Sequence, residues 1–472
     1  MSHIEHGVKA LAKAHIGYAR LPSVRKEFTG KRIVRHALAL GGALVLGACS
    51  TAHMNTEPTA SEEQVYSSLY PYYAELCALS ELKKKPGFGA EISSGMGGHE
   101  VFYLNGVCRD DPGGYPDIRL CDDATAREHG VGLSVNAHYK NANWIATEGR
   151  EFFFHGGLAP GERVTRAAYA RTQAEAKAKG ILDGVEFHSE VLAQAPSGMS
   201  ERDYKYEVSI ATDYAINFGR DRYCARVPLD RVRMARVVDY LNGLNAEYRD
   251  GKKEFEWNVL TNNCSHVAHN ALAAAGIWDE WEMNRFILIS AFDFPVPKNE
   301  FVNVMRRTND FDIGDLDEVY DDRSARQALM TLGTLPAAPG AIAEAEPAFH
   351  DNEVYDTDLT LIFYDDPVFG PYKGWFRRIF SEPRYTDLRA NLQYFAGRYR
   401  QIERDREPLA TFLNRHDGDR VDAETKLSGF YERYYGYVDR ESAKVATELA
   451  SLPSSEAAWV KPHPGKGASP AP

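Results

Sequence analysis

The sequence predicts an α+β fold with an antiparallel sheet, a helical insert and a mainly helical C-terminal extension. Short stretches that alternate between apolar and polar residues lie between residues 99 and 147, and they are typical of half-buried strands. Residues 231–244 carry apolar side chains at helical spacing. Residues 351–452 are rich in Tyr and Arg and favour helices.

The first predicted strand runs from His99 to Leu104. It ends at Asn105-Gly106, the dipeptide that most strongly indicates a hairpin turn. The other predicted strands are 131–137, 144–147 and 223–227.

Three helices are expected before residue 300. Residues 162–179 are rich in Ala, Arg, Lys, Glu and Gln, which suits a surface helix. Asp230 opens the amphipathic helix over 231–244, and a further helix begins near residue 263 and stops at Gly276.

The composition shifts along the chain predict its organisation. We expect a flexible tether before the ordered part, because residues 50–64 are rich in Ser, Thr, Glu and Pro. The predicted parts are a leader (1–48), the tether (49–64), an α+β domain (65–300), a linker region (301–350), the helical extension (351–452) and a disordered tail (453–472).

The charge balance argues against nucleic-acid binding. The chain has 67 acidic and 55 basic residues, for a formal net charge of −12. Nucleic-acid binding needs clustered positive charge to replace the counterions of phosphate. The six cysteines lack paired Cys-x-x-Cys spacing, so a zinc ribbon has no support.

The N-terminal segment resembles the signal peptide of bacterial lipoproteins. Basic residues at 31–35 precede a short apolar run that ends in Leu46-Gly47-Ala48-Cys49. The resemblance implies cleavage after Ala48, acylation of Cys49 with chains such as palmitate, and a protein held in the membrane by its lipid. Ser50 after the cysteine implies the periplasmic face of the outer membrane. Cleavage leaves 47 basic and 65 acidic residues, so the acyl chains rather than a basic surface would hold the protein.

Cys264 is the candidate nucleophile. With Asn262 or Asn263 as the helix cap, Cys264 lies in the first turn, where backbone N–H groups and the helix dipole favour a thiolate. It also shares one apolar stripe with Val267, Ala268, Ala271, Leu272 and Ala275, so a packing role for the thiol is the alternative.

The two nearby histidines are poor partners for this thiol. At 100° per residue, His266 lies about 200° and His269 about 140° around the helix from Cys264. The base must therefore come from another element.

Asn263-Cys264-Ser265-His266 resembles the Asn-Cys-x-His segment of circularly permuted papain-like hydrolases, which include NlpC-type peptidases and lecithin:retinol acyltransferase-like proteins. In that arrangement the histidine comes first, on an early strand, and the cysteine follows at a helix N-terminus. The resemblance covers roughly residues 95–280 and implies a papain-like core with His99 as the base. The alternative for His99 is a hydrogen-bonded histidine at a strand entry.

A third polar group should orient the imidazole. His138 is our first candidate and Asn136 the second, because they share one face of the neighbouring strand; the alternative is that both are ordinary surface residues.

We therefore expect a lipid-anchored thiol hydrolase of the cell envelope, acting through an acyl-enzyme. Amide bonds of cell-wall peptide are the first substrate class and lipid acyl esters, in an acyltransferase, the second. The rival is a non-catalytic envelope lipoprotein that binds or scaffolds. The motifs predict neither a metal nor a cofactor.

The remaining cysteines suggest disulfides, since an oxidising compartment pairs thiols. Cys108 and Cys121 are the first expected pair and Cys77 with Cys224 the second, which leaves Cys264 reduced.

Overall fold

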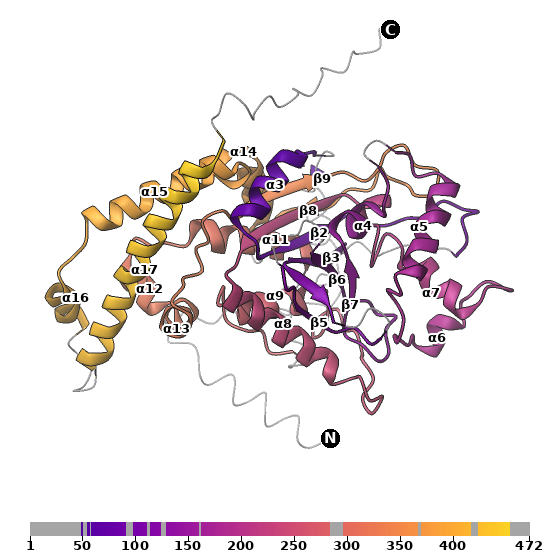
Figure 1. Cartoon of the computed structure of the whole chain (residues 1–472), viewed down its shortest axis with the longest axis horizontal. Coiled ribbons are helices and arrows are strands. Elements are labelled where there is room, and N and C mark those ends of the chain that lie inside the picture. The colour runs from indigo at the N-terminus through magenta and orange to yellow at the C-terminus, as the bar shows by residue number, and fades with distance from the viewer. Residues whose placement is uncertain are drawn as a thin grey trace, which may run out of the picture. The chain divides into compact units, whose positions relative to one another are not determined.

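A six-stranded antiparallel sheet forms the centre of the structure, which is a computed structural model (Figure 1). The strand order is β7 (Ile145–Glu148), β6 (Gly130–Ser134), β3 (His99–Asn105), β2 (Tyr73–Leu79), β8 (Arg222–Pro228) and β9 (Ile342–Glu346). The residues that the structure describes are 49–50, 54–56, 58–90, 98–110, 114–123, 129–159, 162–283, 296–366, 370–416 and 423–453.

The central strands β2 and β8 are buried on both faces, of which one is apolar and the other carries Glu75, Arg222 and Arg226. All seven residues of β2 and all seven of β8 are buried. The hairpin expected at Asn105-Gly106 does not form, because Asn105 is the last residue of β3 and the following strand β4 (Val107–Arg109) pairs with β5 (Ile118–Leu120) rather than with β3. Gly106, with φ 77°, lies between β3 and β4 in a conformation that suits glycine.

Three helices cover the face of the sheet that carries Phe102 and Leu133. They are α8 (Arg231–Ala246), α9 (Cys264–Ala274) and α11 (Pro297–Asp310), and their apolar side chains join one core with these strand residues. Asp230 caps α8, because its side chain accepts a hydrogen bond from the N–H of Arg233.

The opposite face carries a buried cluster of charges. From β2, β8 and β9 come Glu75, Arg222, Arg226, Glu344 and Glu346, and the flanking helices α3 (Ala60–Leu69) and α4 (Arg150–His155) add Glu63, Arg150 and His155. Buried charges need partners, and here each arginine contacts at least two carboxylates.

The remaining helices form an insert and a C-terminal region. The insert holds α5 (Arg166–Ala178), α6 (Ser189–Leu192), α7 (Glu201–Ser209) and the 3-10 turn η2 (Ile216–Phe218). The later helices are α12 (Leu316–Asp321), α13 (Arg323–Leu332), α14 (Tyr372–Ser381), η3 (Pro383–Tyr385), α15 (Leu388–Arg404), α16 (Leu409–His416) and α17 (Ala423–Ser451). Two short ribbons complete the fold: β1 (Cys49–Ser50) with β10 (Ile362–Phe363), and β11 (Asp365–Asp366) with β12 (Gly370–Pro371).

The predicted linker over 301–350 is wrong. This range contains most of α11, all of α12 and α13, and β9, which is an edge strand of the central sheet. Its Ala- and Pro-rich composition suggested a linker, but the alanines of β9 are buried in the sheet. The boundary predicted between 65–300 and 351–452 does not separate two units, because the described residues from Cys49 to residue 453 belong to one compact unit.

The predicted tether over 49–64 is too long. A capping box formed by Thr59 and Glu62 starts α3 at Ala60, so part of this range is helical. The leader (1–48) and residues 454–472 of the tail lie outside the described residues. Among the helices that the structure describes, none has the length and apolarity needed to cross a bilayer.

Candidate functional site

Cys264 is the first residue of α9, as its sequence context predicted. Asn263 is the cap: its side-chain oxygen accepts a hydrogen bond from the N–H of His266 at 3.1 Å. The predicted stripe also forms, because Val267, Ala268, Ala271, Leu272 and Ala275 are buried in the same core as Cys264.

The sulfur of Cys264 contacts the start of strand β3. The backbone N–H of Glu100 donates a hydrogen bond to the sulfur, and the hydroxyl of Ser265 donates one to the Glu100 carboxyl at 2.7 Å. The last residue pair between β3 and β6 is Val101 with Ser134. The thiol therefore lies just beyond the point where the β3–β6 ladder ends, next to the backbone of the residue that follows His99.

The thiol is enclosed. Cys264 is 9% exposed, and the cavity beside its sulfur has a volume of about 10 Å³, roughly the space of one water molecule. Burial, followed by the neighbouring carboxyl of Glu100, raises the pKa of the thiol to about 12. The expectation that the helix terminus lowers this pKa is wrong for this state, since the cost of burying a thiolate exceeds the stabilisation from the backbone N–H groups.

His99 takes part in a hydrogen-bonded chain of buried polar groups. Its Nε2 lies 3.0 Å from the hydroxyl oxygen of Ser134, and this hydroxyl donates to the carboxylate of Asp213 at 2.7 Å. Burial, assisted by the positive charge of Arg220, lowers the pKa of the imidazole to about 3. The imidazole is therefore neutral at neutral pH, the form that can accept a proton.

Asn136 and His138 lie at the same end of the sheet, around Asp213. Asn136 donates to the Asp213 carboxylate at 3.1 Å, and its side-chain oxygen accepts from the N–H of His138 at 3.1 Å. His138 packs against Phe187, and its buried Nδ1 has no hydrogen-bond partner among the described residues. Burial lowers the pKa of His138, against the charge of Asp213.

The His99 ring is therefore contacted by Ser134 and by the backbone carbonyl of Thr212 rather than by the predicted orienting residues His138 and Asn136. Ser134 and Asp213 were not identified from the sequence. Asp213 sits in a tight turn between Ala211 and Ala215, two non-glycine residues with φ values of 61° and 53°, and no motif marks this turn.

His99 and Cys264 are close along the fold but are not hydrogen-bonded to each other in this structure, and both residues are described. The Glu100 side chain lies on the Cys264 side of the sheet. Successive side chains of a strand alternate between faces, so the His99 ring, next to Glu100, points to the Ser134 side.

His266 and His269 are occupied elsewhere, consistent with their predicted directions. The Nδ1 of His266 lies 3.0 Å from the side-chain oxygen of Asn263. The Nδ1 of His269 lies 2.6 Å from the Glu300 carboxyl, and the His269 ring is stacked between two tryptophans, Trp278 and Trp281.

Two disulfides are present, and they join the same cysteines that the sequence suggested. Cys108 bonds Cys121 across a separation of 13 residues, and Cys77 on β2 bonds Cys224 on the neighbouring strand β8. Cys264 is free. Within the described ranges, two groups of side chains are close enough to share a metal ion. They are Cys108–Cys121–His129 and Glu75–Cys77–Cys224, and the cysteines of both groups are in disulfides and so cannot act as thiolate ligands.

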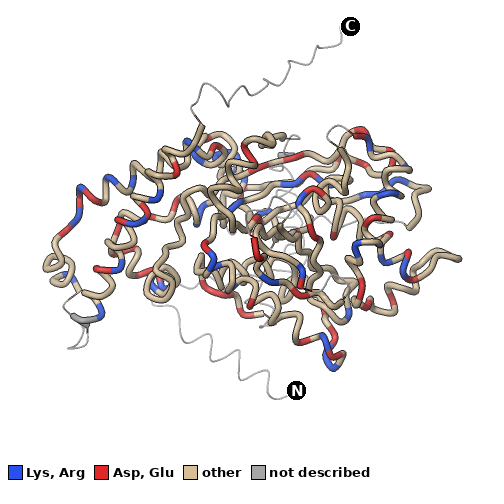
Figure 2. Tube along the Cα trace, in the orientation of Figure 1, with Lys and Arg blue, Asp and Glu red and all other residues tan. Residues whose placement is uncertain are grey.

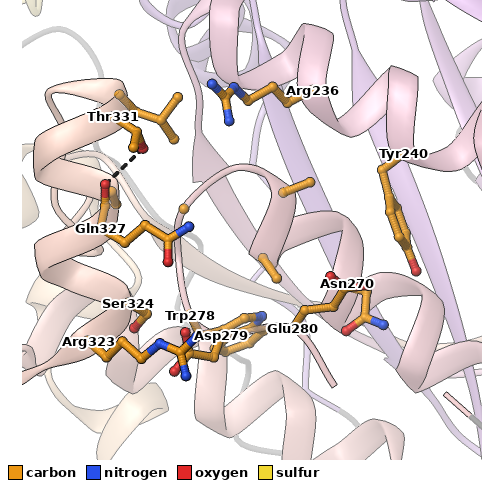
Figure 3. A pocket seen from close by; sticks show the side chains of 15 residues that line it. Arg236, Tyr240, Asn270, Trp278, Asp279, Glu280, Arg323, Ser324, Gln327 and Thr331 are labelled. Carbon is orange, nitrogen blue, oxygen red and sulfur yellow. Dashed lines mark hydrogen bonds between the residues drawn. The ribbon is translucent and has the colours of Figure 1, made fainter. Parts of the chain in front are cut away.

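A separate pocket of about 440 Å³ lies along α8, the end of α9 and α13 (Figure 3). It carries charges of both signs, from Arg236, Arg323, Asp279 and Glu280, and aromatic walls from Trp278 and Tyr240. Cys264 does not line it, because the pocket contacts α9 only from Asn270 onwards.

Comparison of the chain with models of known families, with curated proteins and with solved structures finds no match, so the assignment of this site rests on its geometry and on the local motifs.

Proposed function

We propose that the protein is a cysteine hydrolase or acyl-transfer enzyme with a papain-like core, in which Cys264 is the nucleophile and His99 the base. One observation carries the proposal: the sulfur at the N-terminus of α9 accepts the N–H of Glu100, the residue that follows His99 on β3. The N-terminus of α9 therefore contacts the backbone of the strand entry that carries His99, whose ring points to the Ser134 side in this structure.

The chemistry follows from the protonation states. The thiol is protonated and the imidazole neutral, so His99 takes the proton as the sulfur attacks a carbonyl carbon only once its ring has turned from Ser134 towards the sulfur. In this structure Ser134, held by Asp213, fixes the ring on its far side. In this mechanism, backbone N–H groups at the start of α9 stabilise the oxyanion. Collapse of this intermediate gives a thioester and expels the amine or alcohol, which takes the proton from His99, and water or an acyl acceptor then cleaves the thioester. The separation between ring and sulfur must shorten in the substrate complex.

We place this activity at the cell envelope, on a protein acylated at Cys49 and located on the periplasmic face of the outer membrane. The proposal is supported by the Leu46-Gly47-Ala48-Cys49 segment and by two disulfides, which suit an oxidising compartment. Mass analysis of the processed chain tests the anchor: we expect a diacyl or triacyl mass on residue 49, and an unmodified cysteine or a retained leader contradicts it.

The proposed substrates are amides of cell-wall peptide and, second, acyl esters of lipids. The test is turnover of a muramyl-peptide amide and of a short-chain acyl ester by the mature protein. We expect Cys264→Ser and His99→Gln to lower kcat/KM at least about 100-fold, the usual contribution of a nucleophile or base. His266→Gln is the matched control, since its ring bonds the cap Asn263 rather than the sulfur, and it should retain most activity.

The second candidate is a non-catalytic envelope protein that uses the same fold to bind or scaffold. The enclosed thiol and the small cavity beside it, with room for one water molecule, favour this candidate. It predicts that Cys264 resists alkylation until the protein unfolds, and that neither substrate is turned over. Rapid alkylation of the folded protein, with turnover that Cys264→Ser abolishes, contradicts it.

A further inference from the structure

The short strand that contains Cys49 defines one surface of the protein. Cys49 pairs with Phe363 and Ser50 with Ile362 in the β1–β10 ribbon. An acyl chain on residue 49 would therefore leave the protein beside β10. The Ile362 side chain, 41% exposed, is among the few large apolar side chains that the described residues leave open to water.

Helix α14 lies against this ribbon. The ring of Phe376 stacks on that of Phe363 with a centroid distance of 4.0 Å, and Phe376 and Ile379 are buried. Lys373 and Trp375 are half-buried and Arg377 is exposed. At 100° per residue, Lys373 and Arg377 lie on one flank of the buried face of α14, and Trp375, about 200° from each of them, lies on the other flank.

Basic residues of the neighbouring helix α11 extend the same surface. The Nζ of Lys298 donates to the carbonyl of Ile362 at 2.7 Å and lies 4.1 Å from the centre of the Tyr364 ring. The guanidinium of Arg306 lies 3.7 Å from the centre of the Trp375 ring. Figure 2 shows acidic and basic residues interspersed along most of the chain.

We propose that Lys298, Ile362, Lys373, Trp375 and Arg377 form a membrane-docking surface that lies on anionic phospholipid headgroups. The proposal rests on acylation of Cys49, part of the proposed function. Tryptophan favours the boundary between lipid and water because its ring is apolar and its N–H is polar, and each Lys or Arg near an anionic surface adds attraction. A lipid chain and a basic surface together anchor a protein more firmly than a single chain alone. This proposal replaces the expectation from the net charge that the acyl chains hold the protein without a basic surface.

Docking on this surface would fix the position of the candidate site relative to the bilayer. The side chain of Leu361, the residue before β10, packs over Gly98, since a Cβ built on Gly98 would lie 3.2 Å from its Cδ1. The His99 end of β3 is therefore adjacent to the segment that we expect at the bilayer.

The first experiment measures how deeply Trp375 lies in the bilayer. The mature acylated protein is reconstituted in vesicles of phosphatidylethanolamine and phosphatidylglycerol with brominated acyl chains, and quenching of tryptophan fluorescence is recorded. We expect Trp375→Phe to remove most of the quenching, and Trp257→Phe, a control at a tryptophan that is 39% exposed, to leave it unchanged. Equal effects of the two variants, or unquenched protein, overturn the docking surface.

The second experiment separates the surface from the anchor. The Cys49→Ser variant, expressed from residue 49 so that it carries no acyl chain, is mixed with vesicles of the same two phospholipids without bromine. Binding is then measured by flotation. We expect weak, salt-sensitive binding that falls at least about tenfold in the double variant Lys373→Glu/Arg377→Glu. The matched control Arg231→Glu/Lys252→Glu reverses two exposed charges elsewhere and should bind vesicles as well as the Cys49→Ser chain does.

Each outcome decides one point. An unmodified Cys49 in the mass analysis contradicts the anchor, whereas equal binding of the two double variants to vesicles contradicts the docking surface. Sedimentation of the Cys49→Ser chain with purified peptidoglycan but not with vesicles assigns the surface to glycan and also overturns the proposal.

Discussion

Replacement of Arg226 by methionine should destabilise the protein by about 3 to 5 kcal/mol, because it removes one partner from a buried ion-pair network. The Arg226 side chain is 1% exposed, and its Nη2 lies 2.7 Å from a Glu63 oxygen and 3.0 Å from a Glu344 oxygen. Although burial alone raises the pKa of Glu63, Arg226 and then Arg150 lower it from 4.5 to about 2. That lowering, which Arg226 and Arg150 share, corresponds to about 3 kcal/mol at neutral pH, which is of the same order as the expected destabilisation.

The pH dependence gives the prediction its sign. The folded-state pKa of Glu63 is depressed, so its contribution is complete above pH 4.5 and is lost as the pH falls towards 2. Glu344 behaves oppositely: burial raises its pKa to about 7, so its ionisation costs stability as the pH rises from 4.5 to 7. Without Arg226, the carboxyls of Glu63 and Glu344 protonate more readily. The difference in the free energy of unfolding between the variant and the wild-type protein should therefore become smaller as the pH falls from 7 to 4.

Urea unfolding with the disulfides intact, followed by circular dichroism at pH 7, 5.5 and 4, measures this deficit. Arg231→Met, at an exposed position at the start of α8, is the control and should change the free energy of unfolding by less than about 0.5 kcal/mol. A deficit of Arg226→Met below about 1 kcal/mol, or one that stays constant with pH, would refute the reasoning.

Three further changes follow from the same structure. Replacing Cys77 and Cys224 by serine opens a loop of 147 residues and should cost about 5 kcal/mol in the chain-entropy model, measured by urea unfolding; an unchanged midpoint contradicts a bridge that constrains the unfolded chain. Burial lowers the pKa of His155, but its hydrogen bonds to Glu151 and Glu346 outweigh this and raise it to about 9. The stabilisation from protonated His155 is therefore complete below pH 6.5 and lost as the pH rises through 9, so His155→Gln should be more destabilising at pH 6 than at pH 10 in thermal unfolding, and the reverse order contradicts it. Gly98→Ala places a Cβ 2.4 Å from the carbonyl oxygen of Leu79 at φ 72°, which should cost about 2 kcal/mol or more by the same assay and reduce activity through the adjacent His99; wild-type stability contradicts the strained geometry.

Local patterns were sufficient to predict much of the sheet and the helices next to it. Alternation predicted β3 and β6, and the capping residues Asp230 and Asn263 begin α8 and α9. The dipeptide Asn105-Gly106 was misread as a hairpin turn, because the strand after it pairs with β5 and not with β3. Residues 301–350 were misread because burial is a tertiary property. The alanines of β9 carry no strand signal, yet they fit a strand buried on both faces.

The candidate site was predictable in its residues but not in its contacts. Helical periodicity correctly predicted that the side chains of His266 and His269 point away from the sulfur. The partner of His99 was missed because Ser134 has no distinctive context, and Asp213 comes from a turn 79 residues later in the chain. The pKa of Cys264 was misjudged because a helix terminus is visible in a sequence, whereas the depth of burial is not.

Trapping of the acyl-enzyme tests the central claim most directly. The mature protein is mixed with an activated acyl ester, quenched in acid within the first turnovers and analysed by peptide mass mapping. Our account predicts one acyl group, labile to hydroxylamine, on the peptide that contains Cys264, and strongly reduced labelling in His99→Gln. Turnover of the ester with Cys264 unmodified at every quench time, or equal labelling in His99→Gln, contradicts the Cys264–His99 pair.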